Sequence, residues 1–354
     1  MQCTIFNRKI VHSESTSPDI IPSFISFYFY LQVLDEVLLA KKLNESVFGQ
    51  ALAIEILNRV LMASVDNDGL VGGQQQQQPK ALLLFGWTGT GKSFVTRLIE
   101  EAFVLKGNIH RFSVPLHLSS AANHYVLDNL IGALENSCGP NLIILEDVDD
   151  GNMEAQKKLT EFIESMAAVV NQKTNGGKKV LVVATMSTGG LALNKMMLDL
   201  TSTSSSSSIF SLTSAFSRND GGAVGVSDDD DQVVGVGRHP DPREEDDIRV
   251  EQITQMLSDA NIELQMESNF RENGFQTTLV PFLPLKREHV TKCVINEMVA
   301  QGGGVPSRQD IRLILEEMEF FSESFPIFST SGCKRIAGKV SFLLTSKESF
   351  LGIA

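Results

Sequence analysis

The sequence predicts an α/β fold in which helices cover both faces of a parallel β-sheet, followed by a smaller helical domain. Short apolar runs alternate with helical patterns through the middle of the chain, which is typical of a parallel sheet wrapped by helices. A glycine-rich loop joins the first apolar run to a helical pattern, and the region after residue 285 is mostly helical. The chain has 354 residues, long enough for two domains and a substantial core.

The composition excludes several classes of protein. Hydrophobic residues make up 42% and charged residues 21%, which are ordinary globular values and exclude wholesale disorder. The net charge of −13 argues against a nucleic-acid partner held by phosphate neutralisation. No apolar run is long enough for a membrane-spanning helix. Four cysteines are too few for a disulfide scaffold, although they still allow a single disulfide bridge.

Residues 1–43 form an N-terminal segment of uncertain kind. Basic residues precede the apolar stretch 20–34, as in a secretory signal, but acidic residues follow it and no small-residue cleavage pattern is present. The segment is therefore either an atypical signal or an amphipathic, hydrophobic region.

The remaining elements follow in order along the chain. Helices are expected at 34–43 and 50–63, before a glutamine-rich linker at 69–79. The expected strands cover 81–85, 110–115, 142–145 and 180–184, and the expected helices 93–104, 125–135, 155–170 and 249–260. Residues 201–242 are rich in Ser, Gly and Asp and indicate a disordered surface insertion. The predicted domains are 44–285 (large α/β) and 286–344 (small helical), followed by a tail at 345–354.

A phosphate-binding loop is the strongest motif. The pattern G-x-x-x-x-G-K-[ST] is matched in full by Gly86, Trp87, Thr88, Gly89, Thr90, Gly91, Lys92 and Ser93. An expected strand precedes it and an expected helix follows, so backbone N–H groups would surround the β-phosphate at the helix start. Lys92 would neutralise the β- and γ-phosphates, and the Ser93 hydroxyl would ligate Mg²⁺. The predicted cofactors are ATP and Mg²⁺.

An acidic pair follows the strand 142–145. We assign Glu146 and Asp147 as the catalytic acids, with Glu146 also a Mg²⁺ ligand. The usual order is Asp then Glu. In the reversed order Glu146 still reaches the metal, while the shorter Asp147 falls short of the attacking water, so slow hydrolysis is expected. We expect Asp149 and Asp150 to lie in a solvated acidic loop.

The layout narrows the class of nucleotide-binding protein. A small GTPase would need an Asn-Lys-x-Asp motif to recognise guanine. The nearest match, residues 194–197, lacks the Asp. A nucleotide kinase would not need so long a helical domain after the sheet. A large α/β domain followed by a small helical lid is the AAA+ layout.

Five segments together resemble the torsins, which are AAA+ ATPases of the endoplasmic reticulum lumen and nuclear envelope. They are VFGQALA at 47–53, GWTGTGKSFV at 86–95, VPFLPL at 280–285, KCVINEM at 292–298 and Gly-Cys-Lys at 332–334. The resemblance implies a chaperone-like ATPase that forms homo-oligomers and uses ATP hydrolysis to remodel protein substrates in that compartment.

The resemblance also assigns roles within the nucleotide site. Lys92 and Ser93 take the Walker A roles, although torsins usually have Asn at the position of Ser93. Lys334 matches the sensor-two lysine, which reaches from the lid to the γ-phosphate, and we count it as both a nucleotide-binding and a catalytic residue. The sensor-one Asn falls near Met186, so Thr185 or Ser187 would have to substitute.

Two further features are implied only by the resemblance. Cys293 and Cys333 would form a redox-sensitive disulfide beside Lys334, the alternative being two buried, inert thiols. Alignment of VPFLPL with the equivalent strand of Hsp100-type proteins places the arginine finger at Phe275, an absence that torsins share, and the nearest substitute, Arg271, is expected on the surface. A lamina-associated-polypeptide-type membrane activator would then supply the arginine, so the isolated chain would turn ATP over slowly.

Two other functions stay open. One is a nucleotide-binding pseudo-ATPase that acts as a scaffold with weak or no hydrolysis. The other is a cytosolic Hsp100-like unfoldase. We disfavour the unfoldase because residues 117–119, His-Leu-Ser, stand where an aromatic-glycine pore loop is expected.

Overall fold

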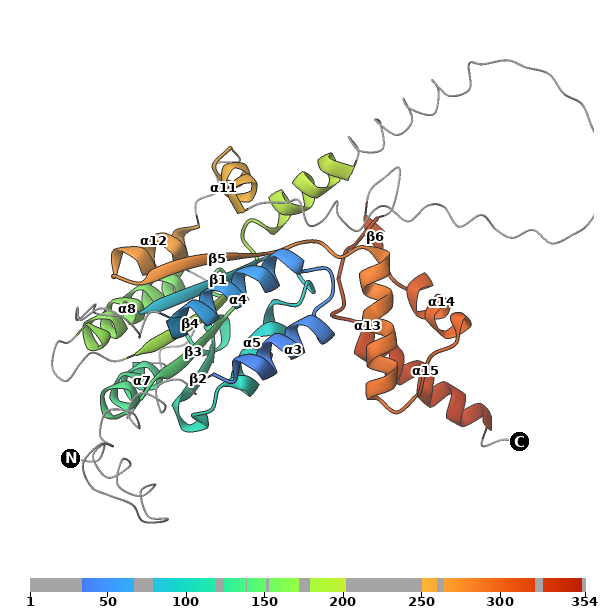
Figure 1. The fold of residues 1–354 in the computed structure, drawn as a ribbon, viewed down its shortest axis with the longest axis horizontal. Helices are drawn as coiled ribbons and strands as arrows, with labels where there is room; N and C mark the ends of the chain where they lie inside the picture. Colours follow the sequence, from blue (N-terminus) through green and yellow to red (C-terminus); the bar gives the residue numbers. More distant parts are fainter. Residues whose placement is uncertain are drawn as a thin grey trace, which may run out of the picture.

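A layered α/β unit is joined to a smaller helical unit (Figure 1). The computed structural model describes residues 34–66, 79–118, 124–137, 139–150, 153–171, 179–201, 250–259, 264–321 and 327–351. Three predicted segments lie outside these residues: the linker at 69–79 except for Pro79, the apolar stretch before Leu34, and nearly all of the insertion at 201–242.

Five parallel strands form the central sheet in the order β2-β3-β4-β1-β5. Their bounds are Lys80–Gly86 (β1), Ile109–Ser113 (β2), Asn141–Glu146 (β3), Val180–Met186 (β4) and Gln276–Phe282 (β5). Strand β1 lies between β4 and β5 and is buried from Ala81 to Gly86, because helices cover both faces of the sheet. Such strands are near-continuous apolar runs, as the sequence of β1 is.

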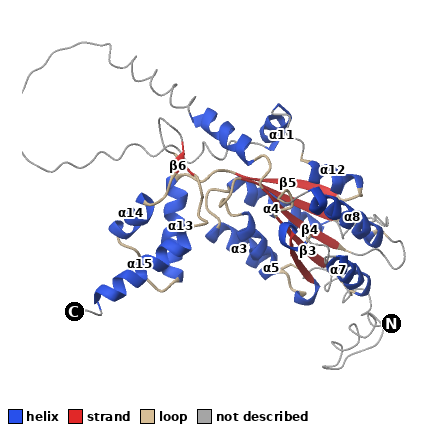
Figure 2. Cartoon of the chain, turned by 180° about the vertical axis from the view of Figure 1, so that it is seen from behind, coloured by secondary structure: helices blue, strands red, loops and turns tan. Residues whose placement is uncertain are grey.

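Helices lie on both sides of the sheet (Figure 2), and alternate residues of the strands enter two separate cores. Leu82 and Leu84 pack on the side of helices α3 (Glu36–Ser46), α4 (Ala51–Asp66) and α5 (Lys92–Ala102). Leu83 and Phe85 pack on the opposite side. The helices there are α7 (His124–Asn136), α8 (Met153–Val170), α11 (Val250–Asp259) and α12 (Gln265–Glu272). The period of two along a strand produces this division.

The helical unit has its own core. Helices α13 (Arg287–Ala300), α14 (Arg308–Glu316) and α15 (Ile336–Leu351) pack around residues that include Val290, Ile314 and Val340. Strands β6 (Phe320–Phe321) and β7 (Phe328–Ser329) pair antiparallel beside it. Helix α14 begins at a capping box in which the Ser307 and Asp310 side chains each bond the other's backbone N–H.

The structure confirms the α/β AAA+ fold class and changes several element bounds. The second strand follows the 3₁₀ turn η1 (Lys106–Asn108). It ends at Ser113 rather than 115, because the chain turns there into the short helix α6 (Val114–His117). Helix α12 and a helix at 190–201 were not predicted. None of the described helices is long and apolar enough to span a bilayer.

Candidate nucleotide-binding site

The phosphate loop runs from the carboxyl end of β1 to the start of α5, as the sequence predicts. Gly86, Gly89 and Gly91 have positive φ angles of 143°, 74° and 111°. L-residues with a Cβ rarely adopt these angles, so glycine fits all three positions. The loop therefore places the amino end of α5, where unpaired N–H groups favour an anion, at the carboxyl edge of the sheet.

Lys92 is buried within this loop. Its Nζ donates hydrogen bonds to the carbonyl oxygens of Gly86 at 2.6 Å and Trp87 at 2.8 Å. Burial lowers the pKa of Lys92 to about 8. The negative charges of Asp149 and Asp147 raise that pKa in part, and the positive charge of Lys334 lowers it further. The negative charge of a nucleotide phosphate would stabilise the charged form of Lys92 and raise its pKa again.

The helical unit touches the phosphate loop directly. The backbone N–H of Cys333 donates to the Gly89 carbonyl oxygen at 3.0 Å, and the Trp87 indole Nε1 donates to the Thr330 carbonyl oxygen at 2.7 Å. A Cβ on Gly89 would collide with the backbone of Ser331. The predicted lid segment therefore lies against the loop.

A disulfide joins Cys293 on α13 to Cys333 in this same lid segment. The S–S distance is 2.07 Å and the two Cα atoms are 6.2 Å apart. The pairing expected from the family resemblance is thus present in the structure. Lys334 follows it, exposed and close enough to Lys92 for its charge to affect the pKa of that residue.

Gln50 ties the loop to the connection between the two units. The side chain is buried, and its amide donates to the carbonyl oxygens of Leu283 at 2.8 Å and Thr90 at 3.2 Å. Its Oε1 accepts from the Leu283 N–H at 2.8 Å. The preceding Gly49 has φ 68° and lies against the ring of His289 on α13. The sequence of this segment contributes to the family resemblance, but its bridging role was not predicted.

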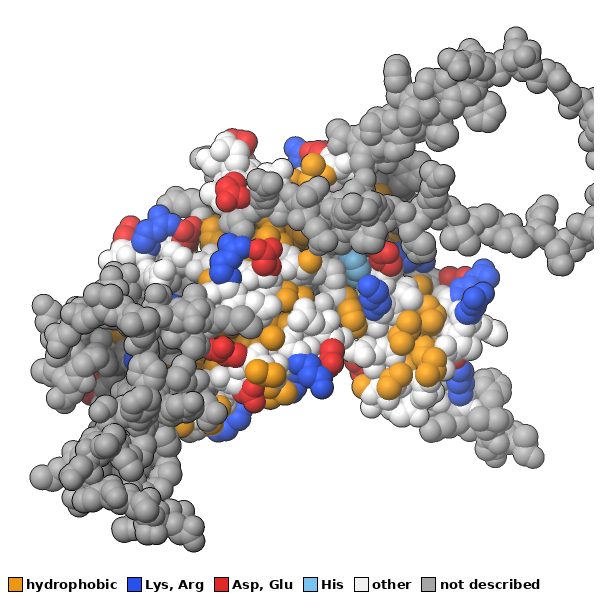
Figure 3. Space-filling model, viewed as in Figure 1, with side chains coloured by type: hydrophobic (Ala, Val, Ile, Leu, Met, Phe, Trp, Pro, Cys, Tyr) orange, Lys and Arg blue, Asp and Glu red, His pale blue; other side chains and the backbone are white. Residues whose placement is uncertain are grey.

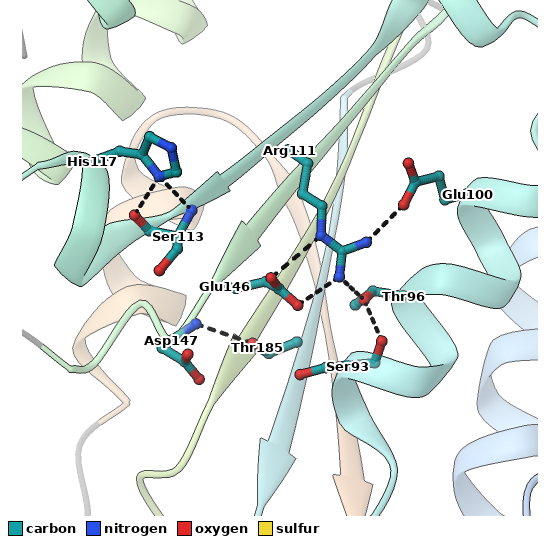
Figure 4. Close-up of polar contacts among 9 residues, drawn as sticks. All are labelled: Ser93, Thr96, Glu100, Arg111, Ser113, His117, Glu146, Asp147 and Thr185. Carbon is teal, nitrogen blue, oxygen red and sulfur yellow. Dashed lines mark hydrogen bonds and ion pairs between the residues drawn. The ribbon is translucent and has the colours of Figure 1, made fainter. Parts of the chain in front are cut away.

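Glu146 is held by an arginine that sequence analysis did not single out (Figure 4). Arg111 on β2 donates to Glu146 from Nη2 at 2.7 Å and from Nε at 3.3 Å. Its Nη1 donates to Glu100 on α5 at 2.7 Å. Burial lowers the pKa of Arg111, but the bonds and charges of these two carboxylates outweigh it and raise that pKa above its ordinary value.

Asp147 lies on the other side of the strand end. Its φ of 54° is the only positive value among the described non-glycine residues, and its N–H donates to Thr185 Oγ1 at 3.1 Å. Burial raises the pKa of Asp147, as do the charges of Glu146, Asp149 and Asp150, while Lys92 lowers it. Thr185 is fully buried and serves as this anchor.

Asp149 does not lie in a solvated loop, so that expectation was wrong. Its Oδ2 accepts hydrogen bonds from the Ser187 N–H at 2.7 Å and the Thr188 hydroxyl at 2.6 Å, and also from the Thr188 N–H. The carboxylate thereby holds the segment after β4, where sensor one was expected. Asp150 is exposed, as expected, and Met186 is buried.

The arginine-finger region contains no free arginine in the described residues 264–286. Phe275 is buried and packs edge-to-face on Phe270 with ring centroids 5.3 Å apart. Arg271 is exposed on α12 and forms an ion pair with Glu267. The exposed position of Arg271 matches the expectation from the sequence.

A cavity of about 770 Å³ lies between α4 and α13. Its lining includes Gly49, Asn58 and His289 but no residue of the phosphate loop. Figure 3 shows that the surface is indented where the two units meet and that acidic and basic side chains gather there.

The strand order, the phosphate loop and the helical lid define an AAA+ P-loop protein. The sequence matches the family described as Torsin over residues 24–129 and the Torsin-1A C-terminal domain over residues 285–343. Two segments of the chain thus match the torsin family.

Similar solved structures include two of Hsp104. The first is a closed-state cryo-electron microscopy reconstruction with ATPγS and FITC casein, at 12% identity and a TM-score of 0.48 over 89% of this chain and 46% of that chain. The second is the S. cerevisiae Hsp104–ADP complex, at 12% identity and a TM-score of 0.46 over 90% of this chain and 48% of that chain. This chain thus spans about half the length of each of these proteins.

Proposed function

We propose that this protein is a torsin-like AAA+ ATPase that binds ATP with Mg²⁺ and hydrolyses it to remodel protein complexes in the endoplasmic reticulum lumen or nuclear envelope. The observation that carries the proposal is the phosphate loop between β1 and α5, with Lys334 of the helical unit beside it. The matches to the two torsin family models support the use of a nucleotide and Mg²⁺.

The residues of the site suit these ligands. The amino end of α5 and Lys92 would bind the phosphates, and Lys334 would contact the terminal one. Mg²⁺ prefers one or two carboxylates together with phosphate oxygens and water. The Ser93 hydroxyl and the carboxylate of Glu146 belong to that donor set, so the residues fit the metal once the ion pair between Glu146 and Arg111 opens. When bound, Mg²⁺ would neutralise charge on the phosphates.

Hydrolysis would depend on Asp147 and on a partner. Asp147 would orient the attacking water and accept its proton, although its short side chain limits its reach. The burial of Phe275 and the ion pair of Arg271 support a missing arginine finger. An activator of the lamina-associated-polypeptide type would supply that arginine to a homo-oligomer, an interaction worth about 10³-fold or more in rate.

Specific observations favour a second candidate, an ATP-gated scaffold with little or no hydrolysis. Glu146 is occupied by Arg111, and Met186 is buried where a polar sensor is expected. Comparing ATP turnover with nucleotide affinity separates the two functions. A chain that binds ATP tightly, yet shows no turnover with an activator present, is the scaffold.

Nucleotide affinity of the full chain tests the common part of both functions. Lys92→Ala should abolish ATP binding, because it removes the buried charge that faces the phosphates. Lys41→Ala, at an exposed position on α3, is the matched control and should bind normally. Unchanged affinity in Lys92→Ala would refute the nucleotide site.

The compartment has its own test. Asn44-Glu45-Ser46 is a glycosylation sequon, and Asn44 is exposed on the last turn of α3. We expect a glycosidase-sensitive mass shift in cells, absent in Asn44→Gln. A cytosolic tagged chain would contradict the proposed location.

A further inference from the structure

Arg111 lies beside the acid that the proposed function assigns to Mg²⁺. It pairs in register with Ile144 on β3, so it projects from the same face of the sheet as Glu146, two residues further on. That face packs against α5, the helix that begins at the phosphate loop. The guanidinium therefore reaches the metal ligand from the neighbouring strand (Figure 4).

The guanidinium occupies both oxygens of the Glu146 carboxylate. Nη2 donates to Oε1 at 2.7 Å and Nε donates to Oε2 at 3.3 Å. Both side chains are mostly shielded, at 28% and 21% exposure, so solvent screens this ion pair less than it would on the surface. A bidentate pair of this kind also fixes the direction of the carboxylate.

Two contacts on α5 hold Arg111 in this place. Nη1 donates to Glu100 at 2.7 Å, and Nη2 lies 3.4 Å from Thr96 Oγ1. The Thr96 hydroxyl in turn donates to the Ser93 carbonyl oxygen at 2.9 Å. The guanidinium is thus fixed one helical turn from the predicted Mg²⁺ ligand, Ser93.

A guanidinium that pairs with both oxygens of a carboxylate competes with a divalent cation for the negative charge of that carboxylate. We propose that Arg111 is a positioning residue that withholds Glu146 from Mg²⁺, so that the nucleotide binds with little dependence on the metal. The proposal rests on the proposed function, since it concerns the same nucleotide site. On this proposal, the weak dependence of nucleotide binding on Mg²⁺ comes from an ion pair between β2 and β3. It does not come from the reversed order of Glu146 and Asp147.

The test measures the affinity of a fluorescent ADP for the full chain in EDTA and in millimolar Mg²⁺. The unaltered chain should show nearly equal affinities. Arg111→Gln frees Glu146, and Mg²⁺ should then tighten ADP binding on the order of tenfold, within the usual range of coupling between two ligands. Adding Glu146→Gln to that variant should remove the gain.

Glu100→Gln is the matched control. It removes another acidic partner of Arg111 but leaves the pair with Glu146, so it should not create Mg²⁺ dependence. Strong Mg²⁺ dependence in the unaltered chain would overturn the proposal without any variant. Intact ADP binding in Arg111→Gln with no new Mg²⁺ dependence would also overturn it and leave a purely structural ion pair. Absence of ADP binding in EDTA and Mg²⁺ alike would instead refute the proposed function.

Discussion

Raising the pH should weaken nucleotide binding through a single residue, Lys92. Burial brings the pKa of its ammonium down to about 8, so a rise in pH through that value neutralises it in the unliganded protein. Bound phosphates favour the charged ammonium and raise its pKa again. Binding above pH 8 therefore requires uptake of a proton, whereas binding below it does not, so affinity is full on the acid side and falls on the alkaline side.

The size of the effect follows from the lowered pKa. With a pKa of about 8 in the free protein and a much higher one in the complex, the dissociation constant should rise about eightfold between pH 7.5 and 9. Each further unit adds about tenfold until the pKa of the complex is reached. An unshifted lysine would give almost no change over this interval.

The assay is binding of a fluorescent ADP without metal across this pH range. Lys334 lowers the pKa of Lys92, so Lys334→Met should move the onset of weakening to higher pH. Lys41→Met, which alters an exposed lysine on α3, should leave the onset in place. Affinity that does not change between pH 7.5 and 9 would refute the reasoning. The reasoning would also fail if Lys334→Met did not shift the pH at which binding begins to weaken.

Three further predictions concern stability. Cys293→Ser with Cys333→Ser opens a bridge of sequence separation 40 and should destabilise the helical unit by up to about 4 kcal/mol, and equal denaturation midpoints in reducing and oxidising buffer would contradict this. Gln50→Ala leaves the buried Leu283 N–H without its partner and should cost about 1–3 kcal/mol in urea unfolding, and a change near zero would count against the bridging role. Phe270→Ala removes a fully buried ring and should lower the free energy of unfolding by about 3–5 kcal/mol in the same assay. A loss as small as that of an exposed residue would contradict this prediction.

The fold was predictable because its signals are local. The run ALLLF is too apolar for an exposed strand, and its glycine loop and helix follow directly along the chain. Helix α12 was missed because its eight residues have only Met266 and Phe270 buried, too few to establish a helical period. The strand at 110–115 was drawn too long because Val114 and Pro115 are apolar, although they begin helix α6.

Without the family resemblance, which gave the Cys293–Cys333 pairing and the place of Lys334, the site was predictable only where one segment supplies it. The phosphate loop is contiguous, so its motif was sufficient. Arg111 and Asp149 contact residues about 35 positions or more away in the sequence. A single sequence does not show which distant residues are in contact. One signal was available for Arg111: parallel strands place residues of matching parity on one face, so a basic residue on β2 could have been tested against the acid that ends β3.

The two halves of the nucleotide site are held by different parts of the molecule. The phosphate loop is braced by the lid through Cys333 and Trp87, and by the connection between the units through Gln50. The acids are braced within the sheet instead, Glu146 by Arg111 and Asp147 by the buried Thr185. A movement of the lid therefore acts first on the groups that bind the nucleotide. A change in the proposed hydrolysis would instead have to reach the ends of β2, β3 and β4, where these acids are held.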